Sequence, residues 1–225
     1  SVVNALSERM EVKVYNKAKV YSQNYSRGLA KSKISIGKCK KNLRGTEIRF
    51  IPDNEIFENI VFSPKKLHSF IKMKAVLVKG AKISFAVDKD LIHDTTPNHA
   101  EFYYPKGIVD LMKENFENRK KVISKFFYAN LDLNSKEKCE IYIAFNEGQQ
   151  SSMESFCNTI KTPDGGSHEN ALKNSVMKSI KLYGKKNQLS KSVNVTPNDL
   201  FDFSDSFISI FINSPSFEGQ TKKRI

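Results

Sequence analysis

Apolar and polar positions alternate in short runs along the first part of the chain, a pattern typical of strands with one buried face. Strands are predicted at residues 10–14, 20–25, 33–37, 46–51 and 83–87. A polar step separates the first two runs, which predicts a hairpin, and the next two are expected to be a second pair of strands. Ser63 supplies a capping residue before Pro64, so a helix should begin there and run to Gly80.

A polar loop at residues 88–99 separates these elements from a second helical pattern. The stripe that defines this helix has the i, i+3, i+4, i+7, i+8 spacing of a buried face and consists of Ile108, Leu111, Met112, Asn115 and Phe116. The end of the helix, near Asn118, is the expected boundary between two domains. Residues 1–118 would form the first domain and residues 119–225 the second.

Aromatic and aliphatic runs dominate the second half of the chain and predict a small sheet. Strands are expected at residues 125–133, 139–145, 155–160 and 206–212. The turn at residues 163–166 is followed by Ser167, which should cap a helix that ends at Gly184. The order strand, turn, helix, strand is typical of a sheet covered on one face by helices. The predicted fold class is therefore α/β or α+β.

The composition and charge of the chain indicate which class of partner it could bind. Hydrophobic residues make up 39% of the 225 residues, enough for a packed core, and no run approaches the roughly 20 apolar residues of a membrane helix. The formal net charge of +13 favours a polyanion such as nucleic acid, and the lysines are densest at residues 171–198, where no Asp or Glu occurs. Lys outnumbers Arg 31 to 6, so a solvated lysine surface is the alternative interpretation.

The cysteines and histidines indicate a cytosolic protein with no metal site of its own. The three cysteines lack C-x-x-C spacing, and their odd number argues against a disulfide framework. The four histidines form no ligand cluster. His168 has no carboxylate or nucleophile at a telling spacing, so a packing or capping role is favoured over proton transfer. No catalytic triad is recognisable from the sequence.

The strongest candidate for chemistry is the loop at residues 215–222, which follows the last predicted strand. Gly219 frees the backbone, while Gln220 and Lys222 place an amide and an ammonium two residues apart, groups suited to a polyphosphate. An ordinary solvated loop is the alternative. Thr46, directly after Gly45 at the start of a strand, is a weaker candidate for touching a ligand, because β-branched residues often begin strands.

Five segments together resemble the B subunit of bacterial type II DNA topoisomerases, the ATPase subunit of topoisomerase IV and gyrase. They are SVVNALS at 1–7, GTEIRFIP at 45–52, SFCNTIKTPDGGSH at 155–168, the strand at 207–212, and PSFEGQTK at 215–222. The resemblance spans the whole chain. Residues 74–77 (KAVL) followed by Gly80 are more similar to topoisomerase IV than to gyrase.

This resemblance implies that residues 1–118 are the C-terminal portion of a GHKL-type ATP-binding domain and that residues 119–225 are a transducer domain with a left-handed β-α-β crossover. Gln220 and Lys222 match the transducer loop that contacts the γ-phosphate of ATP, and Thr46 matches a threonine near the adenine. The family's general-base glutamate, its magnesium-binding asparagine and its glycine-rich lid would lie upstream, and its DNA-cleavage module downstream. The chain therefore looks cut from a longer protein. It is expected to hold no catalytic residue and not to hydrolyse ATP alone.

The resemblance also implies partners. These are double-stranded DNA, the topoisomerase A subunit, and a second B subunit that dimerises with the first when ATP and Mg²⁺ bind, all in the cytoplasm at the nucleoid and away from any membrane. Another GHKL ATPase, such as a mismatch-repair protein, is one alternative. A basic DNA-binding module without enzymatic activity is a second, and it predicts salt-sensitive duplex binding without nucleotide. The product of a split or decayed gene is a third.

Overall fold

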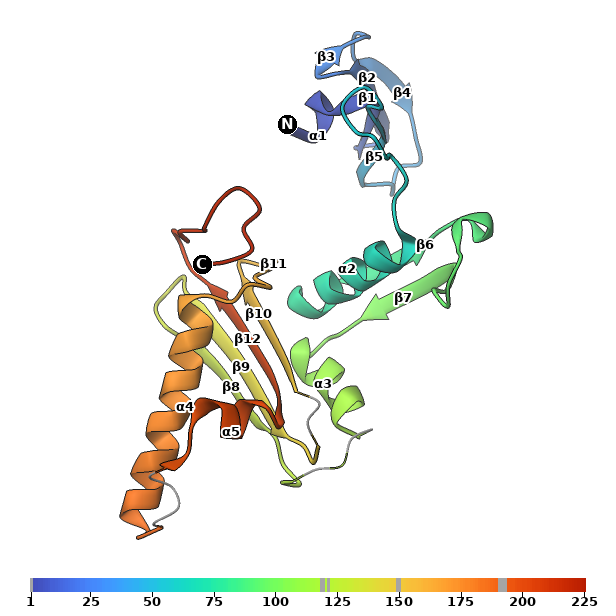
Figure 1. Cartoon of the computed structure of the whole chain (residues 1–225). Coiled ribbons are helices and arrows are strands. Elements are labelled where there is room, and N and C mark those ends of the chain that lie inside the picture. The colour runs from blue at the N-terminus through green and yellow to red at the C-terminus, as the bar shows by residue number, and fades with distance from the viewer. Residues whose placement is uncertain (1, 118–119, 121, 149–150, 190–193) are drawn as a thin grey trace. The chain divides into compact units, whose positions relative to one another are not determined.

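Two compact units make up the chain, Ser1–Ser63 and Pro64–Ile225, and each is described here by itself. A computed structural model describes residues 2–117, 120, 122–148, 151–189 and 194–225, with the side chains of residues 115–117 left out (Figure 1). Both units combine helices with β-sheets, which confirms the predicted mixed α/β class. No helix within the described ranges is long and apolar enough to cross a membrane.

The first unit is a five-stranded sheet with one short helix. Its elements are α1 (Val2–Ala5), β1 (Ser7–Asn16), β2 (Lys19–Ser26), β3 (Leu29–Ala30), β4 (Ser35–Lys38) and β5 (Gly45–Pro52). The predicted hairpin is confirmed as β1 and β2, whose connecting residues Lys17 and Ala18 both have positive φ, as a two-residue hairpin turn requires. The second predicted pair exists as strands, but β4 pairs with β2 and β5 pairs with β1.

The second unit begins with α2 (Pro64–Leu77), β6 (Lys82–Ala86), a 3-10 turn η1 (Lys89–Leu91), β7 (His99–Tyr103) and α3 (Ile108–Glu117). The helix after Ser63, the strand near residues 83–87 and the helix at Ile108 are thus confirmed. Residues 88–98 form the predicted loop apart from η1, but the strand β7, which starts at His99, was not predicted. β7 pairs antiparallel with β6 and so closes a two-stranded sheet.

A five-stranded mixed sheet forms the rest of the second unit, in the order β11-β10-β12-β9-β8 (Figure 1). Its strands are β8 (Phe127–Asp132), β9 (Lys138–Phe145), β10 (Ser152–Cys157), β11 (Ile160–Lys161) and β12 (Ser204–Phe211). β10 and β12 are parallel neighbours, and the crossover between them carries α4 (Ser167–Lys186) and α5 (Pro197–Phe201). The strand-helix-strand crossover implied by the resemblance is therefore present.

Three details of this crossover correct the sequence interpretation. The strand predicted at residues 155–160 ends at Cys157, because Asn158 and Thr159 adopt positive φ angles and turn the chain into β11. Ser167 does not cap α4; the N-cap is Gly166, which makes no side-chain cap bond, and Ser167 is the first helical residue. The helix continues two residues beyond Gly184, and α5, with a capping box at Thr196, was not predicted.

Two apolar clusters hold the second unit together. The larger one joins the helices and hairpin of its first half to one face of the mixed sheet, and its buried members are Ala75, Val76, Phe85, Phe102, Tyr104, Ile108, Leu111, Met112, Tyr142, Ala144, Phe156 and Phe207. The smaller cluster lies on the α4 side of the sheet and consists of Cys139, Ile143, Leu172 and Ile208. The domain boundary expected near residue 118 lies outside the described residues, and the division at that point stays a prediction.

Replacing Phe207 by alanine tests the larger cluster. Phe207 is fully buried and its ring lies 5.3 Å from that of Phe156. We expect Phe207→Ala to lower the free energy of unfolding by about 3–5 kcal/mol, through lost burial and the cavity left behind. Urea denaturation followed by circular dichroism measures the change. Leu182→Ala is the control, because this α4 side chain is 59% exposed and its loss should cost less than about 0.5 kcal/mol. Equal losses would contradict the packing described here.

Candidate functional site

The residues after β12 fold back onto the start of α4, and we call residues 215–225 the C-terminal strap (Figure 1). The backbone N–H of Asp164 donates to the carbonyl of Lys223 over 3.1 Å, and the N–H of Ser167 donates to that of Ile225 over 2.9 Å. Within the strap, the N–H of Glu218 donates to the carbonyl of Arg224 over 2.9 Å. The strap is therefore a closed loop fixed to the turn at residues 163–167.

Gln220 and Lys222 lie on this loop with exposed side chains. The Lys222 ammonium lies 5.6 Å from the centre of the Phe217 ring, a cation–π contact. No carboxylate in the described parts of the chain forms an ion pair with Lys222, whereas Arg224 on the same strap lies 3.8 Å from Glu218. An exposed ammonium without a carboxylate partner fits the role of binding a phosphate group from outside the chain.

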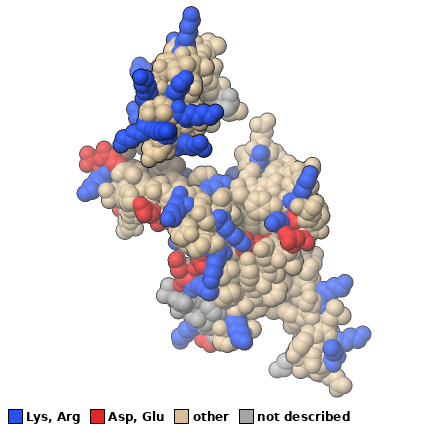
Figure 2. Space-filling view, turned by 180° about the vertical axis from the view of Figure 1, so that it is seen from behind, with Lys and Arg blue, Asp and Glu red and all other residues tan. Residues whose placement is uncertain are grey.

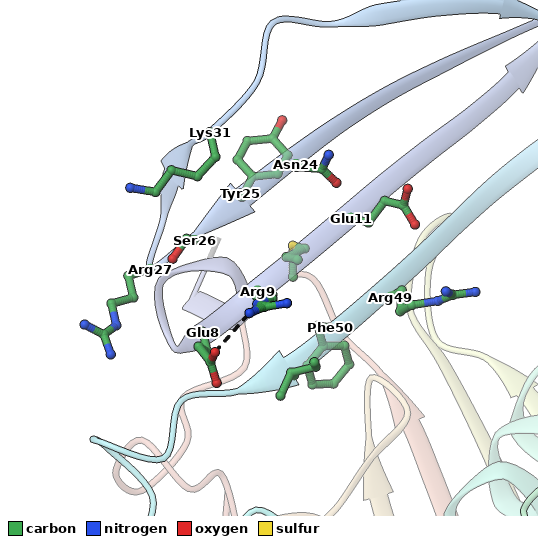
Figure 3. A pocket seen from close by; sticks show the side chains of 12 residues that line it. Glu8, Arg9, Glu11, Asn24, Tyr25, Ser26, Arg27, Lys31, Arg49 and Phe50 are labelled. Carbon is green, nitrogen blue, oxygen red and sulfur yellow. Dashed lines mark ion pairs between the residues drawn. The ribbon is translucent and has the colours of Figure 1, made fainter.

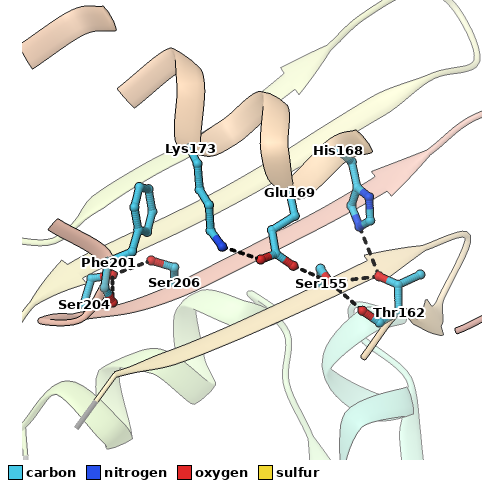
Figure 4. Close-up of polar contacts among 8 residues, drawn as sticks. All are labelled: Ser155, Thr162, His168, Glu169, Lys173, Phe201, Ser204 and Ser206. Carbon is cyan, nitrogen blue, oxygen red and sulfur yellow. Dashed lines mark hydrogen bonds and ion pairs between the residues drawn. The ribbon is translucent and has the colours of Figure 1, made fainter. Parts of the chain in front are cut away.

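A buried polar network holds the turn beneath the strap (Figure 4). The Ser155 hydroxyl on β10 contacts both the carbonyl and the hydroxyl of Thr162 over 2.9 Å, and the Thr162 hydroxyl lies 3.1 Å from Nε2 of His168 on α4. Ser155, Thr162 and His168 are all buried. Because Thr162 contacts Ser155 of the sheet on one side and His168 of α4 on the other, the network links the sheet to the first turn of that helix.

A charged pair extends the same network along α4. Lys173 donates to Glu169 one helical turn away over 2.6 Å, and Glu169 also lies 3.4 Å from the Ser155 hydroxyl (Figure 4). The Lys173 ammonium further lies 5.9 Å from the Phe201 ring of α5. Lys173 is thus part of the internal packing, which removes it from the basic surface expected at residues 171–198.

The remaining described lysines of that stretch are exposed. Lys178, Lys181 and Lys185 follow each other at spacings of three and four residues, so they share one face of α4. Lys186 is exposed as well, and the Lys191 of the sequence argument lies outside the described residues. Figure 2 shows that Lys and Arg side chains outnumber Asp and Glu on the visible face of the molecule.

Lys74 of α2 makes a second contact near the turn of the sheet. Its ammonium donates to the carbonyl of Thr159 over 2.7 Å and approaches the Thr159 hydroxyl at 3.2 Å. Partial burial lowers the pKa of Lys74, and no carboxylate of the described residues forms an ion pair with it. The contact fixes α2 to the β10–β11 connection beside a cavity of about 290 Å³ whose lining includes Glu154 and Lys161.

Thr46, the third predicted site residue, lies in the first unit and is exposed on β5. It pairs with Val14, and the register places Ile48 and Phe50 on the same face of the sheet. Most of this face is apolar yet open to solvent, with Ile48 60% exposed. The structure therefore puts Thr46 on an uncovered apolar surface, and it describes Thr46 and the strap in separate units.

A larger depression of about 710 Å³ lies at the other end of the same sheet (Figure 3). Its cationic lining residues are Arg9, Arg27, Lys31 and Arg49, and its acidic ones are Glu8 and Glu11. Arg27 is already engaged, because it donates to the buried carboxylate of Asp53 over 2.6 Å and to Glu55. Arg9 likewise lies 3.6 Å from Glu8 and Arg49 lies 3.6 Å from Glu47, so three of the four cationic side chains already have a carboxylate neighbour.

A metal ion would find no ready site among the described residues, where no group of three or more His, Cys, Asp and Glu side chains is close enough to hold one. The loop predicted at residues 215–222 is present, its binding role stays a prediction, and the residues that support it were not predicted. Ser155, Thr162 and Glu169 carry no signal of their own. Only their place in or next to the segment 155–168, which contains two adjacent glycines, could have drawn attention to them.

Comparison with known proteins shows which proteins this chain is similar to. Residues 107–225 match the family model for DNA gyrase B. Over the full chain, the B subunit of DNA topoisomerase 4 from Rickettsia conorii is 38% identical and the B subunit of DNA gyrase from Thermotoga maritima is 35% identical. The chain covers 34% of the first and 35% of the second, so it spans about a third of the length of these relatives.

Solved structures agree with this placement. The topoisomerase IV ATP-binding domain of Francisella tularensis superposes with a TM-score of 0.75 at 28% identity, over 99% of this chain and 59% of that one. The 43K ATPase domain of Thermus thermophilus gyrase B gives 0.73 at 28% identity, over 96% and 58%. The gyrase B subunit of Myxococcus xanthus, at 17% identity, shows the same fold with a TM-score of 0.80 over 98% and 62%.

The buried imidazole of His168 predicts a loss of stability in mild acid. Burial lowers the pKa of His168, opposed by the neighbouring Glu169. The unfolded chain therefore takes up the proton first, so stability is complete above the ordinary pKa of about 6.5 and falls as the pH drops below it. His168→Gln keeps a polar group opposite Thr162 and does not titrate. We expect this variant to lose less stability than the wild type between about pH 7 and pH 5, measured by urea denaturation. The same pH dependence in both proteins would contradict the assignment.

Proposed function

We propose, because this chain belongs to the DNA gyrase B family, that it is part of the ATP-hydrolysing B subunit of a type II DNA topoisomerase similar to topoisomerase IV. The family match and the topoisomerase 4 relatives support this function over a mismatch-repair ATPase. One observation in the structure carries the proposal: Lys222 is exposed on a strap that is fixed to the body of the second unit, with no carboxylate of the described residues to neutralise it. The chain alone covers only part of such a subunit.

Lys222 and Gln220 are proposed to sense the terminal phosphate of bound ATP. An ammonium gains a charge-assisted hydrogen bond to the γ-phosphate, and ADP offers no such partner. A ligand shifts an equilibrium only through contacts that differ between its states, and such coupling is typically about 1–3 kcal/mol. ATP would thus bias the position of the strap, and with it the second unit, towards one conformation. Hydrolysis to ADP would remove that bias.

Thr46 is proposed to lie near the adenine. Its open, largely apolar sheet face suits a planar base, because such a ring buries apolar area and leaves its polar edge for a hydroxyl. Mg²⁺ would accompany the phosphates of ATP. Its protein ligand is proposed, from the family resemblance, to be an asparagine upstream of residue 1.

Duplex DNA is the proposed second partner, with the exposed lysines of α4 as one contact surface. A topoisomerase A subunit and a second B subunit complete the proposed assembly, in which ATP binding closes a dimeric gate around a DNA segment. Because such an assembly acts on chromosomal DNA, its proposed location is the cytoplasm, at the nucleoid. A basic DNA-binding module without enzymatic activity is the rival function, favoured only by the charge of +13.

Lys222→Ala in the complete subunit tests the γ-phosphate contact. We expect ATP turnover to fall about 100-fold, because that is the typical effect of removing one hydrogen-bond donor that stabilises negative charge in the transition state. Strand passage should be lost in parallel. Gln220→Ala should act in the same direction more weakly. A coupled assay of ADP release measures turnover, and relaxation of supercoiled plasmid measures strand passage.

Lys223→Ala is the matched control for this experiment. It removes the same charge from the next residue, and the strap uses only the backbone carbonyl of Lys223 for its contact with Asp164. Turnover in the control should stay within about 2-fold of the wild type. Unchanged turnover in Lys222→Ala would refute the proposed contact, and equal losses in both variants would show that only the net charge of the strap matters.

The α4 surface is tested by replacing Lys178, Lys181 and Lys185 together with glutamine in the complete subunit. Each phosphate that these lysines no longer neutralise should reduce the steepness of log K against log salt by about 0.9, so duplex affinity should drop and become less dependent on salt. Fluorescence anisotropy with a labelled duplex at several salt concentrations measures this. Lys136→Gln, at an exposed lysine in the β8–β9 turn, is the control. An unchanged salt slope in the triple variant would exclude this face as a DNA contact.

A further inference from the structure

Gly166 marks the point where the strap touches the body of the second unit. Its φ of +145° lies in a region that L-residues rarely adopt, and a Cβ placed on it would lie 2.2 Å from the carbonyl oxygen of Ile225 and 2.9 Å from the Ile225 nitrogen. Gly80 also has a positive φ but has open space around it, since a Cβ there would meet nothing within 4 Å. A side chain is therefore excluded at Gly166 by the strap itself.

Two backbone hydrogen bonds flank this glycine, one on each side. The donors are Asp164 before it and Ser167 after it, and the acceptors are the carbonyls of Lys223 and Ile225. Ser167 is the first residue of a 20-residue helix whose N-cap makes no side-chain bond. The strap carbonyl therefore satisfies one of the four N–H groups in the first turn of the helix that have no partner within the helix.

The turn is itself held from below. The N–H of Thr162 donates to the carbonyl of Ser155, and the N–H of Gly165 donates to the carbonyl of Thr162, each over 2.9 Å. With the hydroxyl contacts to Ser155 and His168, Thr162 ties the turn to β10 on one side and to α4 on the other. A segment fixed at so many buried points gives the strap a constant position relative to the sheet.

We propose that the turn at residues 163–167 is the docking platform for the C-terminal strap and that Gly166 is the positioning residue that sets where Gln220 and Lys222 stand. This inference rests on the proposed function of those two side chains. Lys222 is only three residues from Ile225. If the contact between Ile225 and Gly166 is displaced, the Lys222 ammonium is therefore displaced as well. An ion pair or hydrogen bond to phosphate does not tolerate such a displacement.

If the turn is the docking platform, Gly166→Ala in the complete subunit should have two effects. The displaced strap should expose its trypsin-sensitive bonds after Lys222, Lys223 and Arg224, so cleavage there, quantified by mass spectrometry, should be at least about 10-fold faster. ATP turnover should fall about 10-fold or more, while ADP affinity measured by calorimetry stays within about 2-fold, because only ATP carries the phosphate that the strap contacts. Gly80→Ala is the control: it also places a side chain at a positive φ, but that side chain meets no atom, so it should resemble the wild type in all three measurements.

Several outcomes would overturn the proposal. Wild-type cleavage in Gly166→Ala would show that the strap does not depend on this seat, and faster cleavage with unchanged turnover would show that the seat does not position Lys222. A parallel loss of ADP affinity would show a general folding defect. Failure of the proposed function is distinguishable, because it appears as unchanged turnover in Lys222→Ala, whereas the cleavage rates still decide whether the strap docks at Gly166.

Discussion

The parallel pairing of β10 with β12 is the constraint from which the candidate site follows. Parallel neighbours end at the same edge of their sheet, so the connection that leaves β10 and the strap that leaves β12 emerge side by side. The first becomes the turn that starts α4, and the second carries Lys222. A hairpin in place of this crossover would separate the two segments by the length of a strand. Topology therefore brings the platform and the strap together before any side chain acts.

Polar groups buried on both faces of this sheet show that it is built for one arrangement more than for maximal stability. Asp205 on β12 accepts hydrogen bonds from the Asn146 amide and the Ser152 hydroxyl, and Ser155 with Thr162 forms the network beneath the turn. A buried hydrogen bond contributes only about 1 kcal/mol net, whereas losing one partner costs more. Such groups penalise a shifted register, because a shift leaves them unpaired. The strap thus meets a sheet edge whose geometry is well defined.

The sequence predicted the elements that depend on local pattern. The hairpin of β1 and β2, the helix after Ser63 and the last strand show clear periodicity or a clear helix start, and all three were confirmed. β7 was missed because its run of His99 to Tyr103 is short and follows a polar loop without a break in composition. The turn at Asn158 was missed because its positive φ angles are held by the pairing of β10 with β11.

The site divides in the same way. Gln220 and Lys222 were selected because a loop with a glycine and two donors is visible in the sequence; the structure confirms the exposed loop, and their role stays a prediction. The seat at Gly166 could not be found, because it depends on an oxygen of Ile225, 59 positions further along the chain, and no local pattern encodes that approach. Ser167 was wrongly predicted to cap α4, because the sequence does not show that Gly166 is the N-cap and that Ser167 is already helical. A serine before a helix is normally the cap, but here a strap carbonyl takes a helix N–H instead.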